Sequence, residues 1–439
     1  MPQVKIKETD LTPVILGEYR NFAVVVPGVL GKDNDGSAFN ADGICELRTQ
    51  SEFEEKVGFA EPLTTTRVIA AEVADDPETE DNEASPAVTE ETVQQIGNQI
   101  AYELLGLGYP VIYKKITEVN DMKNNDFWEP LKDKATYDFR FVISGLLSDE
   151  DQAVGNYIKT VVDYDNNAKS ILETGRGDCV ALLDIDEAVY NKAEDRANRK
   201  ALLSAISKAA NKVNSSKYVA IFAPTVCLLG TSDKYENNKF PASFYYLACF
   251  KYALDHGFAE WYAAAGYTRG VCNYTVESAD VNFGEYLINA LEPRSLSTEE
   301  GALGKAVNVI AKIRGNFYLW GNRTAEPLGT ELVASHFLNI RQLCSTLKKQ
   351  IYVACRRFTF DPNSDILWIN FCNALKPTLE RMKADQGIKD YKIVKLYTAK
   401  KAELKARVRI IPIEAVEDFD IEITLEDNFG ETSATATER

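Results

Sequence analysis

Histidine is the side chain most often used for acid–base catalysis and metal binding near neutral pH, and this chain contains only two, His256 and His336. Neither belongs to an HExxH metal motif, and the GxSxG nucleophile motif is absent. Around Lys305 the sequence resembles part of a phosphate-binding loop, but Glu299 replaces its first glycine and Ala306 its serine or threonine. We therefore expect both histidines to be structural, and we identify no catalytic residue.

Two acidic motifs are similarly incomplete. Residues 163–167 (DYDNN) begin like a calcium loop, but Ala168 stands at the glycine position and Thr174 at the position of the bidentate glutamate. The triplet at residues 176–178 (RGD) is best explained as a turn before a strand. The sequence therefore predicts no metal and no cofactor, and it supports no named reaction. A cytosolic α/β enzyme whose site uses other Asp, Tyr and Lys residues remains an alternative function.

Composition indicates a large folded protein. The chain has 439 residues, 45% of them hydrophobic, which is enough for two or three domains. No run of about 18 uncharged apolar residues occurs, and the N-terminus lacks the apolar stretch of a signal peptide, so we expect no membrane insertion. Eight scattered cysteines without a CxxC pair favour free thiols in a reducing cytoplasm.

The charge argues against a nucleic-acid-binding surface, which needs clustered Lys and Arg. The net charge is −17. Residues 72–91 contain nine acidic residues and no basic one, so they supply about half of this charge. We expect this segment to be a solvated, mobile insertion.

The middle of the chain has the pattern of an α/β domain. Residues 22–30 predict a buried strand, and helical spacing from Val93 to Leu104 predicts a helix that precedes strands at 111–116 and 137–144. Strands at 179–185 and 217–223 flank a helix that carries apolar side chains from Leu202 to Val213. Such a β-α-β unit forms part of a parallel sheet. The predicted fold is α/β, α+β overall, with a central mixed sheet flanked by helices.

Three further helices are expected towards the C-terminus. A capping box at Ser297 and Glu300 predicts a helix that runs through residues 306–310. Apolar repeats predict a helix at 333–351 and another from Asp365 to Gln386, which the turn at residues 361–364 precedes and which Pro377 should kink.

The two chain ends contain short strand patterns that need a sheet to join. The C-terminal strand alternates apolar and acidic side chains, whereas the N-terminal and penultimate strands alternate apolar and basic ones. A meander closed within one subunit and strands exchanged between subunits both explain this pattern; opposite charges facing across strands would favour pairing. The residues concerned are Val4, Lys5, Ile6, Lys7, Arg407, Val408, Arg409, Ile410, Phe419, Asp420, Ile421, Glu422 and Ile423.

Several blocks, in their order along the chain, resemble contractile phage tail sheath proteins and the sheaths of related injection systems. They are SEFEEKVGF at 51–59, the strand pair ALLDI and KYVAIFAP, a proline-started helix followed by WYAAAG at 261–266, WGNRT at 320–324, FDPN at 360–363, and IIPIEAVEDFDIEI near the end. Two features depart from the shared pattern, namely Asn322 and the acidic insertion. These departures concern the exterior surface more than the fold.

The resemblance implies a structural subunit without an active site. Such a subunit polymerises helically around a tail tube, contacts baseplate and tail-terminator proteins, and contracts to drive the tube through a target envelope. It would be assembled in the host bacterial cytoplasm and reside in a virion tail; the sheath of a bacterial contractile injection system or tailocin is the alternative. The resemblance further implies that the second C-terminal helix faces the tube, with Lys376, Arg381 and Lys383 as contacts. The expected domains are an N-terminal arm (1–20), an outer α/β domain (21–325), a C-terminal inner domain (326–413), a C-terminal arm strand (414–426) and a flexible tail (427–439).

Overall fold

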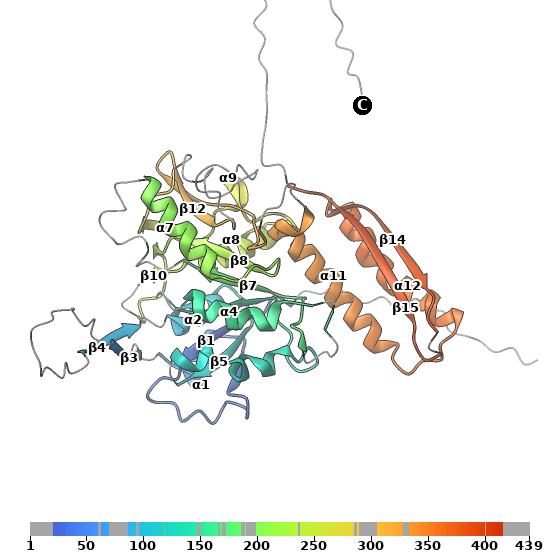
Figure 1. Ribbon diagram of the computed structural model, residues 1–439, viewed down its shortest axis with the longest axis horizontal. Helices are drawn as coiled ribbons and strands as arrows, with labels where there is room; N and C mark the ends of the chain where they lie inside the picture. Colours follow the sequence, from blue (N-terminus) through green and yellow to red (C-terminus); the bar gives the residue numbers. More distant parts are fainter. Residues whose placement is uncertain are drawn as a thin grey trace, which may run out of the picture.

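The protein consists of a large α/β domain and a smaller helical-and-ribbon domain beside it, as the computed structural model in Figure 1 shows. For residues 63–69 and 87–93 it describes the course of the backbone alone. The described residues are 21–59, 63–69, 87–93, 96–117, 119–146, 151–165, 167–168, 173–185, 189, 199–235, 238–284, 288, 305–327, 333–399 and 401–415.

An eight-stranded mixed sheet forms the centre of the large domain, with the strand order β13-β12-β8-β7-β6-β1-β5-β2. The six strands from β12 to β5 are parallel, and β13 and β2 join antiparallel at the edges. The inner strands are apolar on both faces because helices cover both, as is usual for parallel sheets. The strands are β1 (Val24–Val29), β2 (Ile44–Leu47), β5 (Val111–Ile116), β6 (Phe141–Ile143), β7 (Val180–Asp184), β8 (Val219–Ala223), β12 (Asn308–Ile313) and β13 (Asn316–Trp320).

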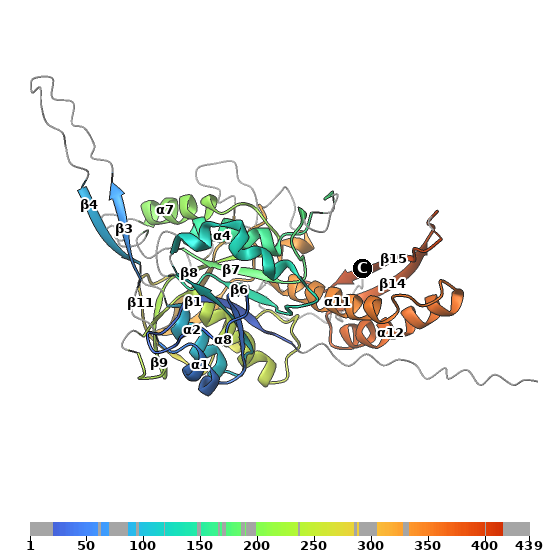
Figure 2. The same cartoon turned by 90° about the horizontal axis from the view of Figure 1, so that it is seen from below.

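Helices cover the sheet in two layers, which Figure 2 shows above and below it. On one face lie α4 (Asp151–Val162) and α7 (Arg199–Lys212), whose buried side chains share a core with Val25 and Val219. On the other lie α1 (Gln50–Lys56), α2 (Gly97–Gly106) and α8 (Ala242–Asp255), which pack on a core rich in aromatic rings. The mixed α/β fold is therefore confirmed.

Smaller elements surround this sheet. A three-stranded sheet is formed by β9 (Val226–Leu229), β10 (Lys239–Phe240) and β11 (Thr275–Ala279), and the short helix α9 (Gly266–Arg269) packs against α8. Between β5 and β6 lie η1 (Val119–Lys123), α3 (Asn125–Trp128) and η2 (Glu129–Lys132), and η4 (Ala334–His336) precedes the small domain.

The small domain contains two long helices and a two-stranded ribbon. Its helices are α11 (Leu338–Arg357) and α12 (Asp365–Ala384), and its ribbon pairs β14 (Ile388–Leu396) with β15 (Lys405–Pro412). Leu343, Leu375 and Met382 belong to its core. α11 starts against the large domain and reaches into the small one, so a continuous helix connects the two (Figure 1).

The acidic segment predicted as an insertion belongs in part to a hairpin. β3 (Leu63–Ile69) pairs antiparallel with β4 (Ala87–Val93), and this hairpin projects from the side of the large domain opposite the small domain (Figures 1 and 2). Residues 87–91 of the segment are thus a strand rather than mobile chain, whereas residues 72–86 lie outside the described residues.

Three sequence expectations need correction. Residues 306–310 form no helix but lead into β12, because the run from Ala306 to Ile310 is buried throughout and pairs with β8. The capping box itself lies outside the described residues. The helix expected from Val93 begins at Gly97, since Val93 ends β4, and the strand expected at 137–144 is only β6.

Candidate assembly surfaces

The ribbon of the small domain presents a basic face to solvent. Alternation sends Val408 and Ile410 of β15 towards the helices and leaves Arg407 and Arg409 exposed. In the ribbon's register Lys392 stands directly opposite Arg409, and like charges in such a pair repel. Among the described residues no strand pairs with the outer edge of β14 or of β15. The ribbon therefore offers two open edges and a positive face that an acidic strand would complement.

The terminal strands expected to fill such edges, residues 4–7 and 419–423, lie outside the described residues, so their exchange between subunits stays a prediction. The chain that follows the ribbon is acidic: residues 414–427 contain seven acidic residues and no basic one.

Within the small domain, α12 packs against α11 and against the ribbon. Ser364 caps it by accepting a hydrogen bond from the Leu367 amide at 3.3 Å, as the preceding turn predicted. Of the side chains expected to face a tube, Lys376 and Lys383 are exposed, and the ammonium of Lys383 lies 3.0 Å from Asp390.

The third of these side chains, Arg381, reaches the large domain, and its contact with a tube stays a prediction. Its guanidinium donates to the buried Glu260 carboxylate of the large domain at 2.9 Å and lies over the Trp261 ring, 5.0 Å from its centre. The Trp261 indole N–H donates in turn to the Asp385 carbonyl at 3.0 Å. Arg381 thus joins α12 to the large domain.

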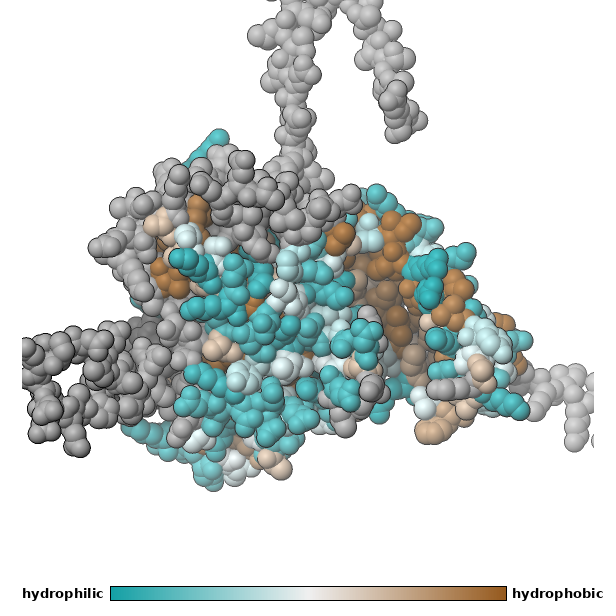
Figure 3. All heavy atoms as spheres, viewed as in Figure 1, coloured by the Kyte–Doolittle hydropathy of each residue, from teal (hydrophilic) through white to brown (hydrophobic). Residues whose placement is uncertain are grey.

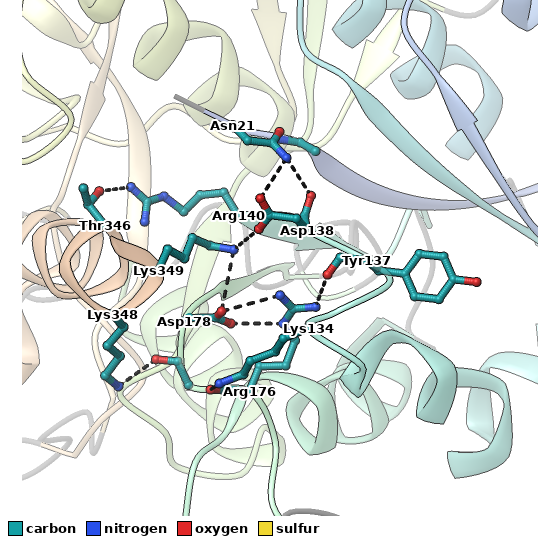
Figure 4. Close-up of polar contacts among 12 residues, drawn as sticks. Asn21, Lys134, Tyr137, Asp138, Arg140, Arg176, Asp178, Thr346, Lys348 and Lys349 are labelled. Atoms are coloured by element: carbon teal, nitrogen blue, oxygen red, sulfur yellow. Dashed lines mark hydrogen bonds and ion pairs between the residues drawn. The ribbon is translucent and has the colours of Figure 1, made fainter. Parts of the chain in front are cut away.

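A buried cluster of charges makes the second connection between the domains (Figure 4). Lys349 of α11 donates to Asp138 at 2.6 Å and lies 3.7 Å from Asp178, which also pairs with Arg176 at 3.0 Å. Burial lowers the pKa of Lys349. Burial also acts to raise the pKa of Asp178, but Lys349 and Arg176 outweigh it and bring that pKa below its usual value. A buried carboxylate with two cationic neighbours stays charged.

Lys348 of α11 extends this cluster towards the residues that precede β7. Its ammonium donates to the Gly177 carbonyl at 2.7 Å and to the Tyr218 hydroxyl at 3.0 Å. Gly177 has φ +68°, and a β-carbon there would lie 2.6 Å from that of Tyr164. The RGD triplet is therefore a turn before a strand, as expected, and it also forms part of the domain junction.

Sequence reasoning missed this junction, although a signal for it was present. Lys348 and Lys349 lie between Leu347 and Ile351 of the apolar repeat in their helix, and Arg140 stands within an apolar strand pattern; its guanidinium donates to Thr346 of α11. Charges at such positions are buried only when paired. What they pair with depends on contacts between residues far apart in sequence.

An exposed apolar group lies at the end of the small domain between α11 and α12. Phe360 is fully exposed and has φ +75°, and Ile366 and Ile369 of α12 are more than half exposed. Apolar residues show at the surface of the small domain in Figure 3. A strained, exposed aromatic residue is often kept for an interaction.

Neither histidine lies in a catalytic arrangement. The His256 ring contacts the Tyr252 carbonyl at 2.8 Å, and the His336 ring accepts a hydrogen bond from the Val333 amide at 3.1 Å. Within the described part of the chain no group of His, Cys, Asp and Glu is arranged to hold a metal ion, and no helix there is long and apolar enough to cross a membrane.

The comparison with known proteins separates sequence from fold. No protein-family model and no curated protein sequence matches the chain. Among solved structures, the sheath complex of the extracellular contractile injection system PVC, in the contracted state, matches with a TM-score of 0.60 over 97% of this chain and 98% of that one, at 13% identity. This chain has the contractile-sheath fold. The helical sheath of the anti-feeding prophage in its contracted state also matches, with a TM-score of 0.59 at 13% identity over 97% and 99% of the chains, as does a chain of the anti-feeding prophage baseplate, with 0.58, 13%, 97% and 99%.

Two of the blocks that carried the sequence resemblance lie within the described part of this sheath fold. Trp320 ends β13, and the buried Arg323 lies over the Phe337 ring, 4.4 Å from its centre. The FDPN block forms the turn before α12, where the Asn363 amide donates to the Lys401 carbonyl at 2.9 Å and so fixes the turn against the ribbon. The expected family resemblance is thus confirmed at the level of the fold.

Proposed function

We propose that this chain is the structural sheath subunit of a contractile particle, which polymerises helically around an inner tube and contracts to drive the tube through a target envelope. The match to sheath structures over nearly the whole chain, small domain included, carries this proposal. Its role is assembly, and it carries out no chemical reaction.

Strand exchange through the ribbon would link the subunits. The open edges of β14 and β15 can each accept an extended strand, and the basic face of Lys392, Arg407 and Arg409 fits the acidic residues of the C-terminal arm of another copy. Each main-chain hydrogen bond gained contributes about 0.5–1.5 kcal/mol, so one short arm adds only a few kcal/mol. Repetition along a polymer makes this sufficient.

The tube contact is assigned to the exposed side of α12. Lys376 and Lys383 are retained from the sequence-based set, whereas Arg381 is engaged with Glu260. Exposed lysines make weak, salt-screened contacts, which suits a tube that must slide on contraction. Baseplate and tail-terminator proteins would complete the assembly at its ends.

The domain junction suggests how contraction would proceed within a subunit. Two buried ion-pair groups, around Lys349 and around Glu260, tie the domains together, and breaking a buried pair is costly. Subunits would therefore rotate as wholes, and the free energy of contraction would come from contacts between subunits.

Electron microscopy of the purified chain tests the proposal. We expect hollow striated tubes from the intact chain, alone or on coexpression with the tube protein, and folded monomers after deletion of residues 1–8 or 418–439. Polymers unaffected by both deletions would refute the arm exchange. A monomer that no tube protein assembles, with a ligand in the cleft of about 850 Å³ between Tyr109, Glu260 and Arg381, would favour the enzyme alternative.

The kind of particle is a separate question. The matched sheaths belong to an extracellular contractile injection system and to the anti-feeding prophage, which favours an injection system or tailocin over a phage tail. The genes beside this one test it: capsid and portal genes would indicate a virion tail, and their absence from a complete cluster a capsid-free particle. In both cases the sheath would be assembled in a bacterial cytoplasm.

A further inference from the structure

Asn21, three residues before β1, contacts a side chain of the domain junction. Its side-chain amide donates to the backbone carbonyl of Asp138 at 3.0 Å and to the carboxylate of the same residue at 3.1 Å, as Figure 4 shows. The amide oxygen of Asn21 accepts a hydrogen bond from the Ala23 backbone at 3.1 Å. Asn21 therefore holds the residues before β1 against the segment that leads into β6.

The Asp138 carboxylate is shared between Asn21 and the small domain. Asn21 donates to its Oδ2 atom, whereas the ammonium of Lys349 on α11 donates to its Oδ1 atom at 2.6 Å. Because the two donors use different oxygens of one carboxylate, each holds that carboxylate where the other needs it. One side chain thus links the residues before β1 to α11.

A second link runs beside the first. Phe22 follows Asn21, and the Arg140 guanidinium lies over its ring, 5.5 Å from the ring centre. The same guanidinium donates to the Thr346 hydroxyl of α11. Thr346 and Lys349 lie three residues apart on α11, so they share one face of that helix. Two consecutive residues before β1 are therefore connected to the same face of α11.

We propose that Asn21 is the positioning residue of the N-terminal arm, and that through Asp138 it couples the end of that arm to the docking of α11. Residues 1–20 precede Asn21 and are the expected arm, so the positioning role rests on the proposed function. The coupling is a property of the single folded chain. It is reciprocal: loss of Asn21 weakens the hold on Lys349, and loss of Lys349 weakens the hold on Asn21 by the same free energy.

The coupling determines where a pull on the arm would act. An arm held by a neighbouring copy would pull on Asn21, whose hydrogen bonds lead to Asp138, where both domains meet. The pull would therefore turn the subunit as a whole instead of peeling β1 from the sheet. Neighbouring subunits would then change position together.

Hydrogen exchange of the unassembled chain tests the coupling. Asn21→Ala should speed exchange in residues 22–29 and also in the turn of α11 around Lys349, by about three- to tenfold. Asn156→Ala is the matched control, since it removes an amide that donates to the Lys212 carbonyl at 3.0 Å, and it should speed exchange only around α4 and α7. Unchanged exchange of α11 in Asn21→Ala would overturn the coupling.

A double-mutant cycle reads the same coupling from stability. Lys349→Met removes the cation and keeps a long side chain, and urea unfolding gives the equilibrium constant for each single variant and for the double variant with Asn21→Ala. The second substitution should change this constant at least about threefold less than it does alone, because the first has already released the carboxylate. Independent effects would contradict the coupling. If Lys349→Met does not fold, hydrogen exchange of Asn21→Ala decides.

Assembly tests the positioning role. Asn21→Ala keeps the whole arm but no longer holds its end, so the protein concentration at which tubes first appear should rise about three- to tenfold, whereas Asn156→Ala should leave it unchanged. An unchanged concentration for Asn21→Ala would overturn the positioning role. Failure of the unmodified chain to form tubes, with or without the tube protein, would instead contradict the proposed function, and the exchange experiment would still decide the coupling.

Discussion

Arg381, in the last turn of α12, donates a hydrogen bond to Glu260 of the large domain, with 2.9 Å between the guanidinium nitrogen and the carboxylate oxygen. Glu260 is 4% exposed in its side chain and also accepts from the Thr346 hydroxyl of α11 at 3.2 Å. One carboxylate therefore contacts both helices of the small domain. These contacts hold the small domain in one position relative to the large domain in the folded subunit.

Arg381→Ala should destabilise the subunit because it leaves Glu260 buried without its cation. Arg381 is 27% exposed in its side chain, so solvent replaces part of the lost interaction and we expect about 1–3 kcal/mol. Urea unfolding followed by tryptophan fluorescence measures the loss. Lys383→Ala, which removes an exposed pair with Asp390, is the matched control and should cost clearly less, because solvent screens an exposed pair. Equal losses for the two variants would contradict the role given to Glu260.

Arg409→Glu should separate stability from assembly. In the monomer it replaces a like-charge pair with Lys392 by an opposite-charge pair, which should leave the free energy of unfolding unchanged or raise it by about 0.2–1 kcal/mol. In the polymer it would place a negative charge against the acidic arm, so we expect the number of tubes in electron micrographs to fall sharply. Lys208→Glu on α7 is the control and should assemble normally. Tubes in normal number from Arg409→Glu would argue against an acidic strand on this ribbon.

The double variant Lys376→Glu/Lys383→Glu tests the tube contact. Both side chains are exposed, so the monomer should stay folded. Its cosedimentation with preformed polymers of the inner tube protein should be lost. Self-assembly of the sheath in the absence of the inner tube should remain. Lys208→Glu/Lys212→Glu, on the exposed side of α7, makes the same change of charge far from the small domain and should cosediment as the unmodified chain does. If the α12 variant also cosediments, α12 does not face the tube.

Asp184 predicts a pH dependence of stability. Burial raises its pKa to about 7, while Ser243 at the start of α8 donates to it from its amide at 2.9 Å. The folded state thus holds a proton that the unfolded state loses near pH 4, so this stability is present below pH 4 and is lost as the pH rises towards 7. The slope is at most about 1.4 kcal/mol per pH unit. Asp184→Asn should flatten the unfolding free energy between pH 4 and 7; an unchanged slope would show that Asp184 is ionised throughout.

We expect Phe360 to lower the stability of the monomer and to contribute to an interface in the assembly. Its φ of +75° is unfavourable for a side chain with a β-carbon, so Phe360→Gly should raise the free energy of unfolding by about 0.5–1 kcal/mol. Phe360→Ala removes the same exposed ring but keeps the strain, so it should bring no such gain. Both variants should assemble less well if the ring is an interface residue. A Gly variant no more stable than the Ala variant would show that the turn carries no strain.

The sequence determined those parts of this protein that local patterns specify. The buried runs at β7 and β8 and the apolar repeat of α7 predicted a β-α-β unit, and the turn at 361–364 placed the start of α12, because period and capping act within a few residues. Block order also indicated the sheath fold. Local patterns gave the wrong prediction at residues 306–310, because a buried apolar run is compatible with a helix or a strand. Pairing with β8 is what makes this run a strand.

Tertiary structure alone decided which charges are available for binding. Arg381 and Lys383 look alike in the sequence, two residues apart on one helix, yet Arg381 reaches Glu260 and Lys383 remains at the surface. Likewise Lys349 is buried beside Asp138 and Asp178, which lie more than 170 residues away along the chain. A charge is drawn into the interior only where a partner satisfies it, and that partner is brought near by the packing of distant segments.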